Sequence, residues 1–381
     1  MKRISAIFLI AIISLTGCVK SFVPDIDKYD NLLVIDGGVT DGPGPYVIRL
    51  SKSGAVKERS KLQPYPNCKV QIKDNVGNTY DLTETQAGVY QSDSAIFRGI
   101  PGRGYQLFIS TADGEHVEST MDELKAALKI ESIEARVEHL NDPSLFFGRD
   151  GYQFYVNTAE MDSKDNYLLW RLQCTYKFRT DFAIASYINK NGVYVIPDNG
   201  DTLRNCFRTV DILKILLLNT TDLNTTAIKH HALYFEDNYS KALTIRYSLK
   251  VIQYKMNEAT FKYWSELQKF TDSGGDLYSA QPYQVTNNLK NITLPDRPVL
   301  GYFMVAGVSE KRIFLNKPPI VFRYDECSVG PPQQFIVEKM LRRADLWPLY
   351  FASTPGLYLL DQECVNCEKL GTMVKPSFWE E

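Results

Sequence analysis

The chain of 381 residues is short of the residues and local motifs that mark most enzymes. It has only four histidines, and it contains no Gly-x-Ser-x-Gly elbow, no Ser-x-x-Lys pair, no His-Glu-x-x-His zinc helix and no Gly-x-x-x-x-Gly-Lys phosphate loop. These absences exclude the enzyme classes that such motifs identify, and we expect a protein that is not an enzyme. A pair of carboxylates far apart in the chain leaves no local pattern, so a surface hydrolase with dispersed carboxylates stays an alternative.

The chain also lacks an excess of one charge and a second long apolar run. Lys and Arg number 43 against 45 Asp and Glu, a formal net charge of −2. Such a chain has no field that would attract a polyanion, so we expect no nucleic-acid partner. After residue 17 no apolar stretch approaches the roughly 20 residues that span a bilayer, so a lipid would be the only membrane attachment.

What the sequence does have is a lipoprotein signal at its start. Lys2 and Arg3 precede an apolar run from Ile4 to Leu15, which is too short to span a bilayer, and Leu15-Thr16-Gly17-Cys18 follows. We predict a signal peptide over 1–17 and a mature chain that begins at Cys18, whose thiol carries diacylglycerol (palmitate). Val19 stands where an Asp commonly retains lipoproteins in the inner membrane, which favours the outer membrane, with the cell-surface or periplasmic face open. An ordinary secretory peptide is the alternative.

Six further cysteines are candidates for disulfides in an oxidising envelope: Cys68, Cys174, Cys206, Cys327, Cys364 and Cys367. The close pair Cys364-Val365-Asn366-Cys367 is typical of a structural staple, with a redox motif or a metal site as alternatives. Zinc would need a second pair at ligand spacing, which the histidines do not supply, so we expect no metal and no cofactor. We expect the C-terminal tail to be stapled, with Cys327 as a candidate partner.

Short alternating segments follow a polar tether over 18–30 and predict a mainly β fold. About seven strands lie within 31–120, with hairpin turns at Asn75-Val76-Gly77-Asn78 and Ala112-Asp113-Gly114-Glu115. This spacing is typical of an immunoglobulin-like or transthyretin-like β-sandwich. The sequence therefore predicts such a domain at 31–120.

The rest of the chain, 130–381, predicts a larger strand-rich domain with one or two helices. Asn257 is a helix cap for Glu258 to Phe270, and a second helix is possible at 335–342. Residues 121–128 fit a short helix or a connector, and Val299–Val308 with Arg312–Leu315 predict a hairpin split at Ser309-Glu310. The end of the chain is expected to wrap this second domain.

Several polar and aromatic groups have both a structural and a functional interpretation. His230 and His231 are adjacent, so on a strand they would face opposite sides and could not readily hold one metal. Helical spacing of Phe261, Tyr263 and Trp264 favours core packing over carbohydrate stacking. Phe378-Trp379 is expected to dock on the body. Ser94 in Asp-Ser-Ala and Thr202 in Asp-Thr-Leu match a short O-glycosylation pattern, with a plain turn or strand end as the alternative.

Several longer strings together resemble one known family. They are Leu33 to Tyr46, Cys206-Phe207-Arg208-Thr209, Arg246 to Tyr254, Gln281-Pro282, Gly301-Tyr302-Phe303, Lys311 to Phe314, Cys364 to Cys367, and Lys375 to Trp379. The chain is similar over almost all its mature length to uncharacterised Bacteroidota outer-membrane lipoproteins classed as a domain of unknown function. It departs from them slightly at Asn287 to Ile292 and at Phe207. The resemblance implies an N-terminal immunoglobulin-like or transthyretin-like domain, a gene commonly beside that of a TonB-dependent receptor, and no catalytic residues.

Two classes of function follow. The first is a non-catalytic, lipid-anchored outer-membrane protein that serves as an accessory or ligand-capture subunit of a TonB-dependent transporter, with an unknown ligand. The alternatives are the surface hydrolase and an envelope adhesin or scaffold, and exposed aromatic clusters would favour adhesion.

Overall fold

The structure is a computed structural model that describes residues 31–54, 62–161, 166–223, 225, 227–272, 285–327, 342–353 and 357–380. The predicted signal peptide, Cys18 and the tether lie outside the described residues, as does the possible helix at 335–342. Within the described residues the fold is mainly β, as predicted, with one α-helix.

The described strands form three sheets. The large sheet has the order β15 (Asn205–Asn219), β12 (Tyr167–Arg179), β17 (Arg246–Met256), β19 (Leu300–Asn316), β1 (Leu33–Thr40), β2 (Val47–Lys52), β6 (Val89–Gln91), β5 (Thr79–Gln86), β4 (Lys69–Asp74), β7 (Gly104–Ser110), β8 (His116–Ser119) and β18 (Leu289–Asn291), with β3 (Gln63–Pro64) on β2 and β9 (Asp122–Glu123) on β7. A second sheet has the order β10 (Ile130–Leu140), β11 (Arg149–Thr158) and β16 (His231–Asp237). The third has the order β14 (Tyr194–Val195), β13 (Ser186–Ile188), β20 (Leu349–Ser353) and β21 (Leu357–Leu360). The helices are α2 (Glu258–Asp272) and the short 3₁₀ helices η2 (Ala344–Leu346), η3 (Gln362–Cys364) and η4 (Cys367–Lys369).

The long strand β19 connects the N-terminal strands of the large sheet to its long central strands. Its first part pairs in parallel with β1, from Val34 opposite Leu300 to Thr40 opposite Ala306, and its second part pairs with β17 in the antiparallel sense. The predicted hairpin at Ser309-Glu310 is therefore wrong. These two residues continue the strand opposite Gln253 and Ile252, because neither supplies the backbone conformation of a tight turn.

Close approach of β1 to β19 requires glycine at two places. Gly301 has a φ of +93°, and a Cβ there would collide with the carbonyl of Ile35. A Cβ at Gly38 would collide with the carbonyl of Met304. The glycines of the strings Leu33 to Tyr46 and Gly301-Tyr302-Phe303 thus permit this pairing.

Two main cores follow from this topology. The N-terminal core contains Ile35, Ile48, Tyr90 and Leu107, and it also takes in Phe303 from β19. Both predicted hairpin turns are confirmed, between β4 and β5 and between β7 and β8. The second core fills the space between the large sheet and the sheet of β10, β11 and β16. Its fully buried members include Trp170, Phe154, Tyr247 and Leu249.

Helix α2 confirms the prediction of a helix after Asn257. Phe261 and Trp264 pack against Leu169 and Met256, as the helical spacing indicated. The helix alternative for 121–128 is wrong, because this segment forms β9 and then an extended connector. It runs extended because Leu124 is buried in the N-terminal core while Leu128 is buried in the second core.

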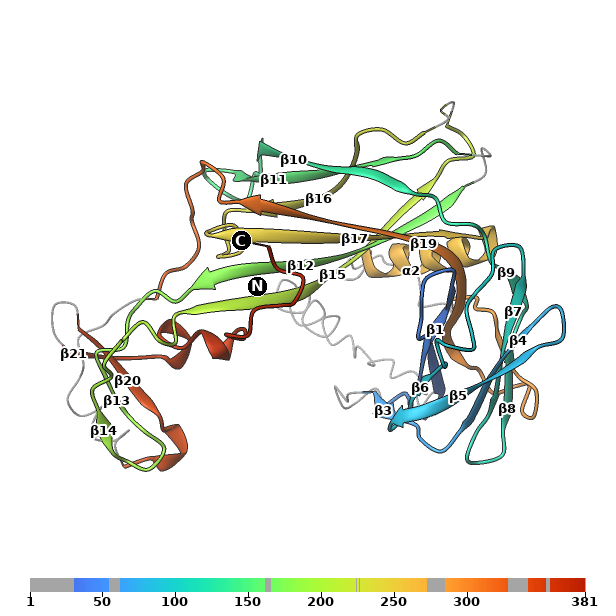
Figure 1. Cartoon of the computed structure of the whole chain (residues 1–381), viewed down its shortest axis with the longest axis horizontal. Coiled ribbons are helices and arrows are strands. Elements are labelled where there is room, and N and C mark those ends of the chain that lie inside the picture. Colours follow the sequence, from blue (N-terminus) through green and yellow to red (C-terminus); the bar gives the residue numbers. More distant parts are fainter. Residues whose placement is uncertain are drawn as a thin grey trace, which may run out of the picture.

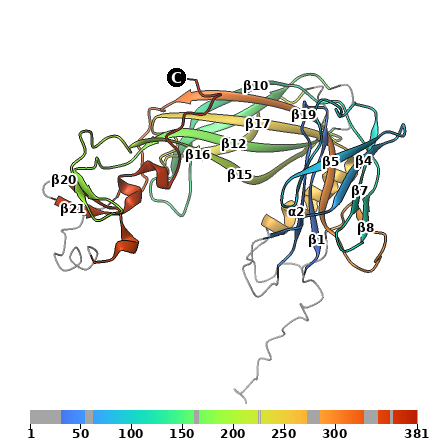
Figure 2. The ribbon, with the colours of Figure 1, turned by 60° about the horizontal axis from the view of Figure 1, so that its bottom comes forward.

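The molecule is an arch (Figure 1). The long strands β12, β15, β17 and β19 form its bridge, the N-terminal strands lie at one end, and the sheet of β13, β14, β20 and β21 lies at the other. Figure 2 shows that both ends extend to the same side of the bridge. Since β1 runs from Leu33 towards the bridge along β19, Asn31 lies at the free base of the N-terminal end.

Two disulfides fasten the C-terminal end. Cys206 at the start of β15 pairs with Cys367, and Cys327 pairs with Cys364, so the tail is stapled as predicted. The other two candidate cysteines, Cys68 and Cys174, form no disulfide and are free thiols.

The last aromatic pair docks on the body, which confirms the prediction for the C-terminus. Trp379 is 5% exposed and packs edge-on against Phe207 and Phe314. Arg312 lies over the ring of Phe378, 3.7 Å from its centroid. The tail therefore covers part of the bridge beside β15 and β19.

One carboxyl group is buried in the second core. Glu236 accepts hydrogen bonds from the hydroxyls of Tyr234 and Tyr247, each at 3.1 Å, and from Ser240 at 3.3 Å. Burial raises the pKa of Glu236 above its ordinary value, and these three donors only partly oppose the effect. The folded state therefore holds this proton more tightly than the unfolded chain does.

We expect removal of the long-range disulfide to destabilise the fold. The Cys206→Ser variant should lose about 3 to 5 kcal/mol of unfolding free energy, because Cys206 and Cys367 are 161 residues apart and their bond restricts the unfolded chain. The measurement is urea unfolding without reductant. Cys68→Ser is the matched control and should change the free energy by less than about 1 kcal/mol, because Cys68 forms no disulfide and serine keeps a donor for the nearby carbonyls. Equal effects of the two substitutions would contradict the fold.

We expect Glu236 to give the fold a pH dependence. Because its pKa is raised in the folded state, its contribution is fully present below the ordinary value of 4.5 and is lost as the pH rises through the folded-state pKa. The Glu236→Gln variant should therefore show a smaller loss of unfolding free energy between pH 4.5 and pH 8 than the wild type. Urea unfolding at several pH values measures the difference, with exposed Glu160→Gln as control. Parallel profiles for all three proteins would refute the assignment.

Candidate functional site

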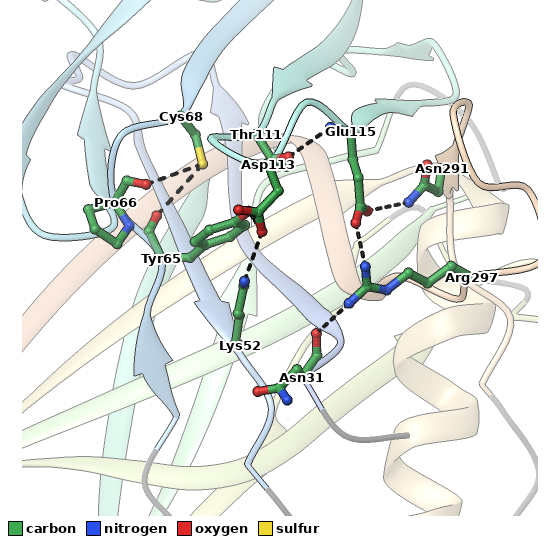
Figure 3. Close-up of polar contacts among 10 residues, drawn as sticks. All are labelled: Asn31, Lys52, Tyr65, Pro66, Cys68, Thr111, Asp113, Glu115, Asn291 and Arg297. Carbon is green, nitrogen blue, oxygen red and sulfur yellow. Dashed lines mark hydrogen bonds and ion pairs between the residues drawn. The ribbon is translucent and has the colours of Figure 1, made fainter. Parts of the chain in front are cut away.

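The base of the N-terminal end carries a cluster of charged and polar side chains (Figure 3). Two carboxylates come from the hairpin between β7 and β8, and each one meets a cation from another part of the chain. Asp113 pairs with Lys52 of β2 at 3.1 Å, and Glu115 pairs with Arg297 from the segment after β18. We call these four residues the base cluster. It connects elements that are up to 182 residues apart in the sequence.

Further hydrogen bonds fix the base cluster in place. The hydroxyl of Tyr65 donates to Asp113 at 2.6 Å, and the amide of Asn291 donates to Glu115 at 2.7 Å. Arg297 also donates to the carbonyl of Asn31 at 3.0 Å. The cluster therefore holds the point at which the described chain begins.

The electrostatics of the base cluster suit a structural role. The Tyr65 hydroxyl and then the Lys52 ammonium lower the pKa of Asp113. A carboxylate with a lowered pKa and a bound cation is a poor general acid. Glu115 forms an ion pair with Arg297. The arrangement can lock the base together.

Three of the cavities lined by described residues each have one acidic side chain in their walls. A cavity of about 1090 Å³ borders the segment from Asn287 to Val299, with Asp296 in its wall. One of about 290 Å³ lies beside α2 and contains Asp122, and one of about 240 Å³ lies under Phe378 and contains Glu310. A glycosidase needs two carboxyl groups facing one substrate. The hydrolase alternative gains no support from these cavities.

Asp122 in the second cavity is tied to the start of α2. It accepts hydrogen bonds from the side-chain amide of Asn257 and from the hydroxyl of Thr260 at 3.1 Å. Burial raises the pKa of Asp122, while these donors oppose the effect. Thr260 also bonds the hydroxyl of Tyr302 at 3.2 Å. These contacts explain the position of the carboxylate by its structural role at the helix N-terminus.

The loop between β10 and β11 presents two phenylalanines to solvent. Phe146 is 95% exposed and Phe147 is 57% exposed. Asp142 holds the loop, because it accepts from Ser144 and forms an ion pair with Arg149 at 2.8 Å. We call Phe146 and Phe147 the aromatic tip. Large apolar side chains on a loop with such internal bonding are typical of a contact surface for another molecule.

Among the described residues that the sequence singled out, only Cys68 lies beside the base cluster. His230 and His231 face opposite ways, as expected: His230 stacks on Tyr155, and His231 stacks on buried Trp170. Burial lowers the pKa of His231. The described residues contain no group of His, Cys, Asp or Glu that could hold a metal ion. Cys68 lies beside the cluster, with its thiol near the carbonyls of Tyr65 and Pro66 at 3.8 and 3.7 Å.

The two proposed glycosylation residues are both accessible. Ser94 lies in a turn in which Asp93 accepts from the backbone N–H of Ala95, and Thr202 donates to the carbonyl of Asn199 at 2.6 Å. The residues of the base cluster were missed from the sequence. Only the turn at 112–115 marked their neighbourhood, since Lys52 and Arg297 carry no local signal.

A comparison with family models decides the relationship. The model described as "Domain of unknown function (DUF4249)" matches residues 19–312. The chain belongs to the DUF4249 family. The matched region includes the base cluster and the aromatic tip, whereas Cys327, Cys364 and Cys367 lie beyond it. No curated protein matches the chain.

Two solved structures match this DUF4249 chain with low sequence identity and low TM-scores. A DUF4785 family protein from Legionella pneumophila subsp. pneumophila str. Philadelphia 1 has 10% identity and a TM-score of 0.18, over 58% of this chain and 51% of that one. The BSP domain of a biofilm associated protein has 10% identity and a TM-score of 0.13, over 74% of this chain and 59% of that one. This chain thus spans about half of the length of either structure. In the described part of the chain no helix has the length and apolar character needed to cross a membrane.

We expect the Arg297→Met variant to loosen the base. It removes the ion pair with Glu115 and the bond to Asn31, so the unfolding free energy should fall by about 1 to 2 kcal/mol. Urea unfolding measures this change. The control is Arg49→Met, which breaks the exposed pair of Arg49 and Asp36 at 3.9 Å and should cost less than about 0.5 kcal/mol. If both variants lower the unfolding free energy by the same amount, the base cluster does not stabilise the base beyond an ordinary surface ion pair.

Proposed function

We propose that the protein is a non-catalytic, lipid-anchored accessory subunit of an outer-membrane transporter of the TonB-dependent type. The lipoprotein signal ending at Cys18 supports the anchor, and the resemblance to Bacteroidota lipoproteins supports the outer-membrane location. The immunoglobulin-like or transthyretin-like build of 31–120 is part of the same proposal. The aromatic tip is the observation that carries the docking function.

The position of the base fits an anchor at Cys18. Residues 18–30 can span at most about 45 Å when fully extended. Because Arg297 binds the carbonyl of Asn31, the tether begins at the free base of the N-terminal end. The base then lies closest to the membrane, and the bridge stands away from it.

The aromatic tip fits a protein contact better than a structural role. The guanidinium of Arg323 lies over the ring of Phe147, 4.8 Å from its centroid, and this contact holds the Phe147 side chain in place. Phe146 packs edge-on against Phe147 with centroids 4.8 Å apart and has the rest of its surface in water. Burial of such a pair in a partner would remove apolar surface from contact with water and so stabilise the complex.

The test is affinity purification of the tagged, lipidated protein from its native outer membrane in mild detergent, followed by mass spectrometry. We expect a stoichiometric TonB-dependent receptor with the wild type, and at least a tenfold loss of that receptor with the double variant Phe146→Ser/Phe147→Ser. Both side chains are exposed, so the variant should fold normally.

Tyr194→Ser is the matched control, since Tyr194 is an aromatic residue 54% exposed on β14. It should retain the receptor. A wild-type protein that purifies alone would refute docking on a transporter, and a receptor retained by the double variant would refute the aromatic tip as the contact.

A further inference from the structure

The outer face of the sheet of β10, β11 and β16 carries an unusual aromatic pair. Ile133, Phe154 and Val156 point into the second core. Because side chains alternate along a strand, Glu134 and Tyr155, which are paired across β10 and β11, point outward. On this outer face the ring of His230 stacks on the ring of Tyr155, with centroids 3.7 Å apart and planes 11° apart.

The backbone of His230 is strained to hold this position. Its φ is +53°, a conformation that residues other than glycine seldom adopt. The backbone N–H of His230 donates to the side-chain oxygen of Asn157 at 2.7 Å, which holds the strained residue in place. Strain of this kind is maintained only where the surroundings enforce it, and it gathers at binding sites.

Polar groups border the stacked rings on the same face. Glu134 accepts from the Asn157 amide at 2.8 Å and from Arg136 at 3.3 Å, and Glu138 accepts from the hydroxyl of Tyr155 at 2.6 Å. The carboxylates thus have partners, and Glu134 also lies 3.6 Å from the ring nitrogen of His230. Ala232, which pairs with Tyr155 across β16, is small and exposed, so the space beside the rings stays open. We call Tyr155, His230, Glu134, Glu138, Arg136 and Asn157 the sheet platform.

We propose that the sheet platform binds a neutral oligosaccharide. The C–H face of a sugar ring packs on an aromatic ring, while its hydroxyls both donate to carboxylates and accept from amides and guanidinium groups. On its outer face the platform offers the His230 ring, the two carboxylates and the Arg136 guanidinium, whereas the buried Asn157 amide is engaged by Ser132 and Glu134 and only holds the other groups in place. The proposal rests on the proposed accessory-subunit function and extends it by naming a class of ligand that the subunit would capture.

The hydrogen bonds already made within the platform favour a neutral ligand over an ion. A cationic ligand would need a free carboxylate, but Glu134 and Glu138 are already engaged by Arg136, Asn157 and Tyr155. An anionic ligand would meet both carboxylates at close range. Hydroxyl groups can join these hydrogen bonds without displacing an ion pair.

The test is affinity gel electrophoresis of the purified, lipidated protein in detergent, with amylopectin, dextran, laminarin, xylan or mannan cast in the gel. Polygalacturonate is the acidic comparison. We expect at least one neutral polysaccharide to retard the wild type, and the Tyr155→Ala and His230→Gly variants to bind it at least tenfold more weakly. Tyr194→Ala is the matched control and should migrate like the wild type.

His230→Gly separates binding from folding. Glycine accepts a φ of +53° readily, so this variant relieves strain and should unfold at the same or a higher urea concentration than the wild type. The proposal is overturned if no neutral polysaccharide retards the protein, if polygalacturonate alone does so, or if both ring variants stay retarded. The assay needs no transporter, so its failure is distinct from a failure of receptor copurification.

Discussion

The parallel pairing of β1 with β19 is the interaction on which the rest of the structure depends. It joins Val34 to Leu300 across most of the chain, and the same strand then continues into the bridge beside β17. Without it the N-terminal core would lack Phe303, and the segment that carries Arg297 would have no fixed place beside Glu115. Parallel strands so far apart in sequence are slow to pair, because the chain loses the conformational entropy of a long loop before the stabilising contacts form. The glycines at the crossing and the ion pairs at the base are the features that let this pairing persist.

Charge in this molecule serves mainly to connect distant segments. Lys52 with Asp113 and Arg297 with Glu115 join β2 and the segment after β18 to one hairpin. Arg149 likewise joins Asp142, in the loop after β10, to Asp237 at the end of β16. In every case the carboxylate has its cation within contact distance, so the pair fixes the position of one segment against another. An arch held in this way can present surfaces in a constant orientation relative to its base.

Local signals in the sequence were enough for the turns, for the helix and for the tail. The Asn-x-Gly-Asn turn at 75–78 predicted the hairpin of β4 and β5, and Asn257 marked the start of α2. Two large rings near the C-terminus predicted that this end packs on the body, and Trp379 is buried there. The bridge was harder, because Ser309-Glu310 reads as a break although its neighbours on β17 keep it extended. Which cysteines pair, and that Arg297 meets Glu115, depend on tertiary contacts between distant residues and leave no periodic trace. The strain at His230 is a property of backbone geometry, which composition and spacing do not encode.

The second sheet is the part of the fold that is free to recognise other molecules. Its inner face is fixed by the second core, so its outer face and the loop after β10 can vary without loss of the fold. The edge strand β10 alternates Glu134, Arg136 and Glu138 on the outer face, and such charges protect an exposed edge from pairing with another chain. The same charges therefore serve two ends: they prevent unspecific strand addition, and they border the stacked rings of Tyr155 and His230. A face that repels strands yet offers a ring and polar groups selects a compact, hydroxyl-rich ligand, while the aromatic tip at the far end of the same hairpin stays available to a protein.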